Sequence, residues 1–428
     1  MSTVTARESQ PRGIPVVART AALADPGALL SLLPDSADPA RLSSWVHRGE
    51  GMVGWGRALE VTAHGTGRFD QLERWWRDVV ASAVVRDEVR LPGTGPVAFG
   101  SISYAGESPC GATLVVPEVI VGTRGGRWWV TTIGTGAELP APVLPRQSEP
   151  RAPEGVAFAD GALSPADWEG TVDTAVARIA RGELDKVVLA RDLRVSAERD
   201  IDPRWLLQRL AERYDTTWVF AVDGLVGATP EMLVRLEKGL VTSRVLAGTI
   251  QRTGDDAHDL ALAASLARSS KDLEEHEYAV RSVADALRPH CTSVNVPESP
   301  FVLHLTNVMH LATDVAGVLA DGVTSLRLAA SLHPSAAVCG TPSAVADRVI
   351  AELEGMDRGR YAGPVGWMDA SGDGEWGIAL RCGAYEPRDA GSMRLFAGCG
   401  IVAGSDPAAE LAESDAKLVP MRDALTAG

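Results

Sequence analysis

The residues best suited to chemistry gather between residues 361 and 417. Arg381 falls within an apolar strand pattern at residues 376–385, between the small residues Ala379 and Gly383. A guanidinium in such surroundings needs an anion as its partner, and the small neighbours leave room for one. The pattern predicts that Arg381 faces either a bound ligand or a buried carboxylate of the chain itself.

Two glycines follow on the next strand pattern, residues 393–402. Gly398 and Gly400 point the same way, so this strand offers bare backbone to a ligand. The same glycines could instead mark β-bulges. Ser405-Asp406-Pro407 then opens a helix pattern whose N–H groups favour an anion nearby.

That helix carries Glu410, Glu413 and Lys417 on one face, at i, i+3 and i+7. Glu413 and Lys417 could be a solvated ion pair of the ordinary i,i+4 kind. Together with the arginine and the open backbone, these side chains favour a site for a small carboxylic acid, with a metal ion as a possible bridge.

Two further residues could transfer protons. Lys186 opens the apolar strand pattern Lys-Val-Val-Leu-Ala-Arg, where its side chain can reach solvent or face a dry pocket and act as a base. Glu231 follows Pro230 just before another strand pattern. It is either an ordinary turn residue or, in a pocket, a proton donor.

A third carboxylate could hold a metal. The helix pattern that begins at Lys271 turns Leu273, His276 and Val280 inward, and Glu275 lies beside that stripe. Acidic residues in a first helical turn usually complement the helix dipole. Glu275 is nevertheless the residue of this turn best placed to reach a metal, and one or two carboxylates with substrate oxygens are the usual ligands of magnesium.

Composition excludes several classes of function. The 428 residues are 45% hydrophobic and 23% charged, as in soluble globular proteins, and the net charge of -15 disfavours nucleic acid and anionic membranes as partners. Five scattered cysteines without a C-x-x-C pair fit a reducing cytoplasm. The sequence has no signal peptide, no run of ~20 apolar residues, and no common phosphate, zinc or serine-hydrolase motif. We therefore expect a cytoplasmic protein, and a monomer because no surplus amphipathic helix is evident.

These residues must be positioned by a mixture of strands and helices. Residues 1–13 are predicted to be a flexible tail, followed by a β-rich region with strands at 52–61, 97–104, 113–121 and 128–133 and a hairpin around Gly125-Gly126. The Pro-rich residues 138–155 are the best candidate for a linker. Beyond them hairpins and helices alternate without regular βαβ units, which predicts an α+β protein.

The order of several motifs resembles the chorismate-utilising enzymes and, among them, the isochorismate synthases. The matching blocks include KVVLAR from Lys186, GATPEML from Gly227, SSKDLEEHE from Ser269, LHPSAAVCGTP from Leu332 and GDGEWGIALRC from Gly372. They span about residues 155–417, and the first 150 residues resemble the family only loosely.

The resemblance implies one α+β domain over residues 14–428, with two large stacked antiparallel β-sheets and helices outside. Residues 14–150 would be its divergent half and 151–428 its motif-bearing half. It also implies a magnesium ion held by Glu275 and Glu413 against the carboxylate of chorismate. The implied substrate-binding residues are Gly248, Thr249, His310, Ala337, Tyr361, Arg381, Gly398, Gly400 and Lys417.

The implied reaction adds water at C2 of the ring while the C4 hydroxyl leaves, with Lys186 taking a proton from water and Glu231 giving one to the leaving group. Relatives that use ammonia lack a water-activating lysine, so Lys186 favours water. Salicylate synthases keep the lysine and also eliminate pyruvate, and the loop at Ala337 lacks the polar residue associated with that step. A non-catalytic chorismate-binding relative is the remaining alternative. Cys339 and Cys399 depart from the small residues expected near the site and are interpreted as packing residues.

Overall fold

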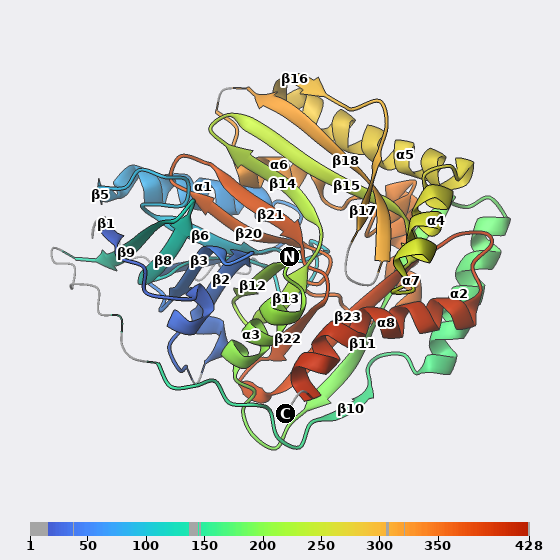
Figure 1. Ribbon diagram of the computed structural model, residues 1–428, viewed down its shortest axis with the longest axis horizontal. Helices are drawn as coiled ribbons and strands as arrows, with labels where there is room; N and C mark the ends of the chain where they lie inside the picture. Colours follow the sequence, from blue (N-terminus) through green and yellow to red (C-terminus); the bar gives the residue numbers. More distant parts are fainter. Residues whose placement is uncertain are drawn as a thin grey trace, which may run out of the picture.

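The computed structural model describes residues 16–36, 38–136, 144, 147–304, 308–320 and 322–426, without the side chains of Thr249, Lys271 and Glu275. The predicted tail at residues 1–13 lies outside this part of the chain. The described residues form two large sheets with helices around them (Figure 1).

The larger sheet has 13 strands. In spatial order they are β10 (Ala157–Asp160), β11 (Lys186–Ser196), β23 (Asp389–Ile401), β22 (Cys382–Glu386), β13 (Leu225–Thr229), β12 (Trp218–Val222), β2 (Leu42–His47), β3 (Glu50–Trp55), β8 (Val119–Arg124), β9 (Arg127–Thr135), β1 (Val16–Leu23) and β5 (Val84–Asp87), with β19 (Gly340–Thr341) paired to β11. Among these pairs only β1–β5 is parallel.

The smaller sheet has 10 strands, and all of its pairs are antiparallel. In spatial order they are β16 (Cys291–Asn295), β18 (Val308–Leu319), β15 (Leu240–Gln251), β14 (Met232–Glu237), β21 (Gly374–Ile378), β20 (Pro364–Asp369), β6 (Val97–Ser101), β7 (Ala112–Val116) and β4 (Leu59–Ala63), with β17 (Phe301–His304) paired to β18. Both sheets thus contain strands from both sides of the predicted linker, and the predicted α+β fold with two large antiparallel sheets is confirmed.

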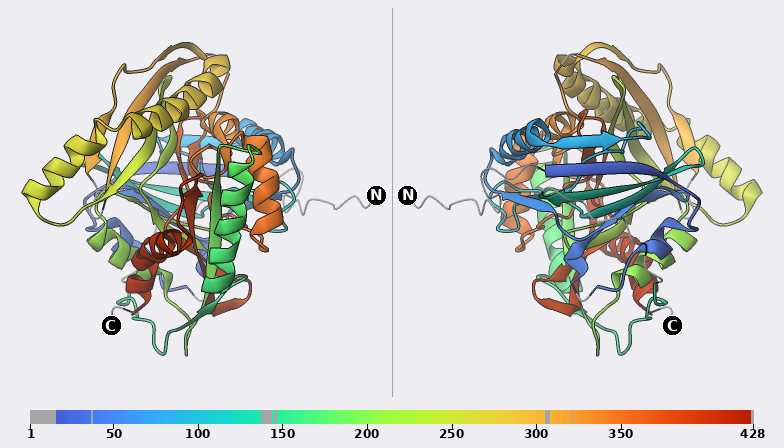
Figure 2. Two further views of the ribbon diagram at one scale, coloured as in Figure 1. Left: turned by 90° about the vertical axis from the view of Figure 1, so that its right-hand side faces the viewer. Right: turned by 90° about the vertical axis from the view of Figure 1, so that its left-hand side faces the viewer.

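The helices lie outside the sheets (Figure 2). They are α1 (Arg68–Ser82), α2 (Pro165–Ala180), α3 (Pro203–Arg213), α4 (Asp256–Leu266), α5 (Ser270–Leu287), α6 (Ser325–Leu332), α7 (Ser343–Leu353) and α8 (Pro407–Thr426), with 3-10 turns at Leu29–Leu32, Pro39–Arg41 and Arg288–His290. Local sequence sets several of their starts: Ser164 and Ser269 accept hydrogen bonds from the N–H groups of Asp167 and Asp272. No helix in the described ranges is long and apolar enough to cross a membrane.

Two large apolar cores hold these layers together, and a third, small cluster packs α4 on β18 through Ala263, Leu266, Met309 and Leu311. The larger core includes Phe99, Trp376 and Trp168, and so joins the smaller sheet to α2. The second includes Leu207 and Leu425, from the helices α3 and α8 that pack on strands of the larger sheet. Burial of this apolar surface is the main force that fixes the two sheets relative to the helices.

Three strands that the sequence predicts as continuous are each divided between the sheets. The pattern at 52–61 breaks at residues 56–58 into β3 and β4. The pattern at 113–121 breaks at Pro117 and Glu118 into β7 and β8, so the hairpin around Gly125-Gly126 joins β8 to β9. The pattern at 376–385 breaks at residues 379–381 into β21 and β22. The prediction of one strand with Arg381 on its face is therefore wrong, because the chain leaves one sheet and enters the other at that residue.

Candidate active site at the seam between the sheets

A second chain segment crosses between the sheets beside Arg381. Strand β13 pairs with β22 in the larger sheet, and β14, which follows after only Pro230 and Glu231, pairs with β21 in the smaller sheet. In Figure 1, β13 and β22 accordingly lie below β14 and β21. Glu231 and Arg381 thus occupy neighbouring crossing points, which we call the seam.

Backbone hydrogen bonds fix the seam. The N–H of Ile378 donates to the carbonyl of Glu231 over 3.0 Å, and the N–H of Ala228 donates to the carbonyl of Arg381 over 3.2 Å. The hydroxyl of Thr229 donates to the carbonyl of Ile378 over 2.6 Å. These bonds hold both chain crossings in register, so the two side chains start from a fixed backbone.

Arg381 adopts a left-handed backbone conformation, with φ 48°. This conformation costs free energy in a residue with a Cβ. It persists only where contacts with the surrounding structure hold the backbone in place. Burial lowers the pKa of its guanidinium, and the nearby Glu413 carboxylate acts in the opposite direction. The sequence correctly indicated an arginine among apolar neighbours. Its side chain, however, projects from the point where the chain passes between the sheets and not from the face of a strand.

Glu231 has a strongly perturbed carboxyl group. Burial raises its pKa to about 7, even though Arg381, Lys186 and Lys417 each act in the opposite direction. A carboxyl group with this pKa holds its proton near neutral pH and can donate it. The charges of Arg381, Lys186 and Lys417 thus all reach this carboxyl group, and Lys186 and Lys417 both contact the backbone of β23, at Gly400 and Gly398.

Strands β11 and β23 supply Lys186 and the glycines. Lys186 begins β11, and a Cβ built on Gly400 would lie 2.9 Å from its Cε atom. A Cβ on Gly398 would lie 2.7 Å from the carbonyl oxygen of Leu189 and 3.1 Å from the Tyr361 hydroxyl. The ring of Tyr361 stacks on Phe396 with 5.2 Å between centroids. The side chains of Lys186 and Tyr361 therefore lie directly against the backbone of Gly400 and Gly398, where any larger residue would collide with them.

We expect the variant Gly398→Ala to weaken both the fold and the site. Its methyl group would meet a backbone carbonyl that cannot rotate away, so strand β23 must shift, at a cost of about 1–3 kcal/mol. The variant should show a lower Tm and a higher KM for the substrate. The matched variant Gly170→Ala, inside α2 with open space around it, should leave KM unchanged and raise Tm slightly, because alanine favours a helix over glycine. Equal behaviour of the two variants would contradict this interpretation.

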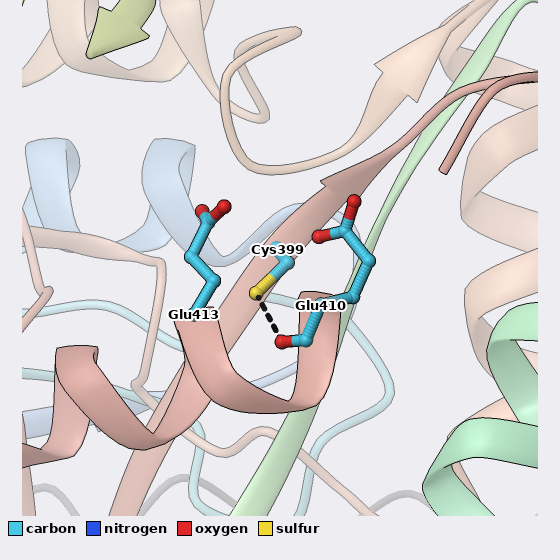
Figure 3. A group of neighbouring side chains, drawn as sticks. All are labelled: Cys399, Glu410 and Glu413. Atoms are coloured by element: carbon cyan, nitrogen blue, oxygen red, sulfur yellow. Dashed lines mark hydrogen bonds between the residues drawn. The ribbon is translucent and has the colours of Figure 1, made fainter. Parts of the chain in front are cut away.

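Helix α8 places two carboxylates beside this backbone (Figure 3). Lys417 donates to the carbonyl of Gly398 over 2.8 Å and lies 2.6 Å from a carboxylate oxygen of Glu413. The predicted pairing of Glu413 with Lys417 on one face is therefore present, with Lys417 partly buried. One ligand atom from each of Glu410, Glu413 and Cys399 lies within 4.8 Å of the others, the only such group of acidic, histidine and cysteine side chains found among the described residues.

Strands β15 and β18 supply the remaining predicted residues. Thr249 pairs with His310 in register, next to a bulge at Gly248, which has φ 74°. Burial, together with Arg381 and Lys417, lowers the pKa of His310 to about 4, so its ring is neutral at pH 7. The side chains predicted at Thr249 and Glu275 lie outside the described ones; the backbone of Glu275 lies on α5.

The loop that contains Ala337 is held against β11 by a buried ion pair. Arg358 donates to the carbonyls of Val338 and Val188 over 2.8 and 2.7 Å, and Nε donates to Glu354 over 2.9 Å. Glu354 in turn accepts the N–H of Ala190 over 2.7 Å. The pair therefore ties the loop to the strand that begins at Lys186.

Comparison with known proteins identifies the family. The family model for chorismate binding enzymes matches residues 2–426. The chain belongs to the chorismate binding enzymes. The isochorismate synthase DhbC of Bacillus subtilis is 42% identical over 273 residues, which cover 61% of this chain and 68% of that protein. The salicylate biosynthesis isochorismate synthase of Pseudomonas aeruginosa is 36% identical over 395 residues, 87% of this chain and 82% of that protein.

Solved structures of chorismate binding enzymes have the same fold. The crystal structure of DhbC from Bacillus anthracis superposes with a TM-score of 0.74 at 30% identity, covering 92% of this chain and 98% of that one. The menaquinone-specific isochorismate synthase MenF from Escherichia coli gives a TM-score of 0.78 at 23% identity, over 98% and 97% of the two chains. The resemblance that the sequence motifs indicate is thus confirmed at the level of family and fold.

Within this chorismate binding enzyme, two candidate metal-binding side chains were not predicted as ligands. Glu410 was recognised only as a neighbour of Glu413 on one helix face, and Cys399 only as a packing residue. The i,i+3 spacing of the two glutamates was the available signal. The approach of Cys399 could not be read from the sequence, because it depends on how α8 docks on β23.

Proposed function

We propose that this protein is an isomerase that converts chorismate to isochorismate, in a reversible reaction that adds water at C2 and removes the C4 hydroxyl. The convergence of Lys186 and Glu231 in one cationic site carries the proposal. The isochorismate synthase activity named for its relatives supports it. Chorismate has two carboxylates, which fit a site that combines Arg381, Lys417 and the open backbone at the two glycines.

The proposed proton transfers follow from the placement of the two residues. Lys186 is the base that accepts a proton from the attacking water as the new C2–O bond forms. Glu231, protonated near neutral pH, donates its proton as the C4–O bond breaks and the hydroxyl leaves as water. Arg381 and neutral His310 bind and orient the carboxylated substrate, and Tyr361 fixes the position of β23 by stacking on Phe396.

The carboxylates of α8 fit a magnesium ion. Glu410 and Glu413 offer the oxygen donors that a hard cation prefers, whereas the Cys399 thiol is not a suitable magnesium ligand. Glu413 would hold the ion together with Glu275, and Glu410 is close enough to contribute. When bound, magnesium would neutralise a substrate carboxylate and act as a Lewis acid beside it.

We expect Glu413→Gln to weaken magnesium binding by at least about tenfold, because one charged ligand is lost from a small set. Calorimetric titration of the protein with MgCl₂ measures this directly, and chorismate turnover should then require higher magnesium concentrations. Glu386→Gln, on β22, serves as the control. Unchanged magnesium affinity in Glu413→Gln would remove this residue from the metal site.

A product assay tests the reaction itself. Incubation with chorismate and MgCl₂ should yield isochorismate without free pyruvate. Salicylate with pyruvate would instead identify the salicylate synthase alternative, and binding of chorismate without any product would identify a non-catalytic relative. We further propose a cytoplasmic location, on the basis of the scattered cysteines without a C-x-x-C pair, and a monomer, as expected from the sequence.

A further inference from the structure

Glu231 is one of the residues that line a small pocket. The pocket is bounded by α5, by strands β14 and β15, and by the segment from α6 to Ala337, and its volume is about 80 Å³. Ligand sites for drug-sized molecules usually measure about 300–1,000 Å³, so this pocket is too small for a ring with two carboxylates. It has room for several water molecules, since about 10–15 Å³ of such volume suffices for one.

The lining of the pocket is mostly apolar, but several serines in it can bind water. The Ser335 hydroxyl oxygen is buried and has no hydrogen-bond partner among the described residues, and buried hydroxyls without a protein partner usually bind water. Ser331 and Ser282 also line the pocket, and Ser282 is exposed on α5. The residues that line the pocket therefore include both the solvent-exposed Ser282 and Glu231 at the seam.

The proposed reaction needs such a connection. Each turnover leaves Lys186 with one additional proton and Glu231 with one fewer, although substrate and product are isomers. Before the next turnover, Lys186 must release its proton to solvent and Glu231 must gain one. As long as product, or the next substrate, fills the cationic side of the site, it blocks proton return from that side. The pocket lined by α5 leaves Glu231 within reach of water during that time.

We propose that this pocket is the proton-return route of the enzyme: water held by Ser335 passes a proton from solvent near Ser282 to Glu231 once per turnover. This inference rests on the proposed function. It assigns Ser335 a role as a positioning residue for that water, because its hydroxyl is the pocket's buried donor and acceptor without another partner. Ser331 already donates its hydroxyl to the carbonyl of Leu328.

Filling the pocket tests the proposal. In Ala279→Leu, the larger side chain on α5 displaces water, and we expect kcat to fall by about tenfold, less than after loss of the acid itself. The KM for chorismate should stay within about twofold, because only proton return is impaired. The solvent deuterium isotope effect on kcat should rise, because proton transfer then limits turnover. Ser335→Ala should show the same changes more weakly, and Ser335→Thr, which keeps the hydroxyl, should restore kcat.

The controls separate this inference from simpler explanations. Tyr278→Leu changes an exposed residue of the same helix that does not line the pocket and should behave as wild type. Should Ala279→Leu fail to fold, Ser282→Met at the exposed end is the second filling variant. Wild-type kcat and isotope effect in the filled variants, or a higher KM with unchanged kcat, would overturn the route. A wild-type protein that forms no isochorismate would overturn the proposed function itself.

Discussion

Lys186→Ala is expected to bind chorismate with nearly unchanged affinity and to convert it about 10²–10⁴-fold more slowly, the usual contribution of a positioned base. The substrate carboxylates are bound by other groups, Arg381 and the α8 side of the site, so binding should survive. Lys186 lies against Gly400, where only the absence of a side chain makes space for its stem. Its removal leaves a gap at the position from which water is activated.

Single-turnover kinetics with chorismate measure the rate of the chemical step, and a direct binding titration measures the affinity, so a loss of catalysis is distinguished from a loss of binding. Lys238→Ala, in the turn between β14 and β15, removes a lysine away from the seam and serves as the matched control. Turnover by Lys186→Ala at the wild-type rate would remove the base assignment. A loss of affinity without a loss of kcat would instead make Lys186 a binding residue.

Glu231→Gln should lower kcat to a similar extent, about 10²–10⁴-fold, because an amide of nearly the same shape has no proton to give to the leaving hydroxyl. The pH profile of the wild-type protein supplies a second observable. The active form of Glu231 is protonated, so kcat/KM should decline as the pH rises through about 7. In Glu231→Gln this descending limb should disappear from the residual activity, whereas Glu386→Gln should keep it.

The same substitution should also affect stability, with a definite sign. The pKa of Glu231 is raised in the folded protein, so the folded state binds this proton more tightly than the unfolded state does. The contribution of Glu231 to the free energy of unfolding is therefore fully present below about pH 4.5 and falls as the pH rises to about 7. Above that pH it changes no further. Glu231→Gln should be more stable than wild type at pH 8 and lose this advantage at pH 4.5. Equal Tm differences at both pH values, measured by calorimetry, would show that the carboxyl group is not perturbed.

Much of the fold could be predicted because it is encoded locally. The inward stripe of Leu273, His276 and Val280 identifies α5, and alternation identifies strands such as β6 and β9. The crossings at Pro117-Glu118 and at Arg381 could not be predicted, since a strand that changes sheets has the same alternation as one that does not. Only the partner strands, distant in sequence, determine where the crossing falls.

The same distinction applies to the site. Arg381, Glu231 and Lys186 were identified as residue types out of place in apolar or turn surroundings, which is a local signal. Glu231 and Arg381 meet because two antiparallel chain segments cross between the sheets, and Lys186 approaches from the start of β11. No spacing in the sequence reveals this arrangement. The residues of α8 were identified as a helix face, but the approach of Cys399 to Glu410 depends on docking and could only be seen in three dimensions.

The intermixing of early and late strands also bears on how the chain reaches its native state during synthesis. Strand β2 pairs with β12, and β6 pairs with β20. Trp45 therefore cannot pair until Phe220 has left the ribosome, and Gly100 cannot pair until Gly366 has. Until then two apolar strands have unpaired edges, which are prone to aggregation. Such distant pairings raise the contact order and slow folding. Yield in a heterologous host should therefore depend on chaperones that protect the nascent first half until its partners are made.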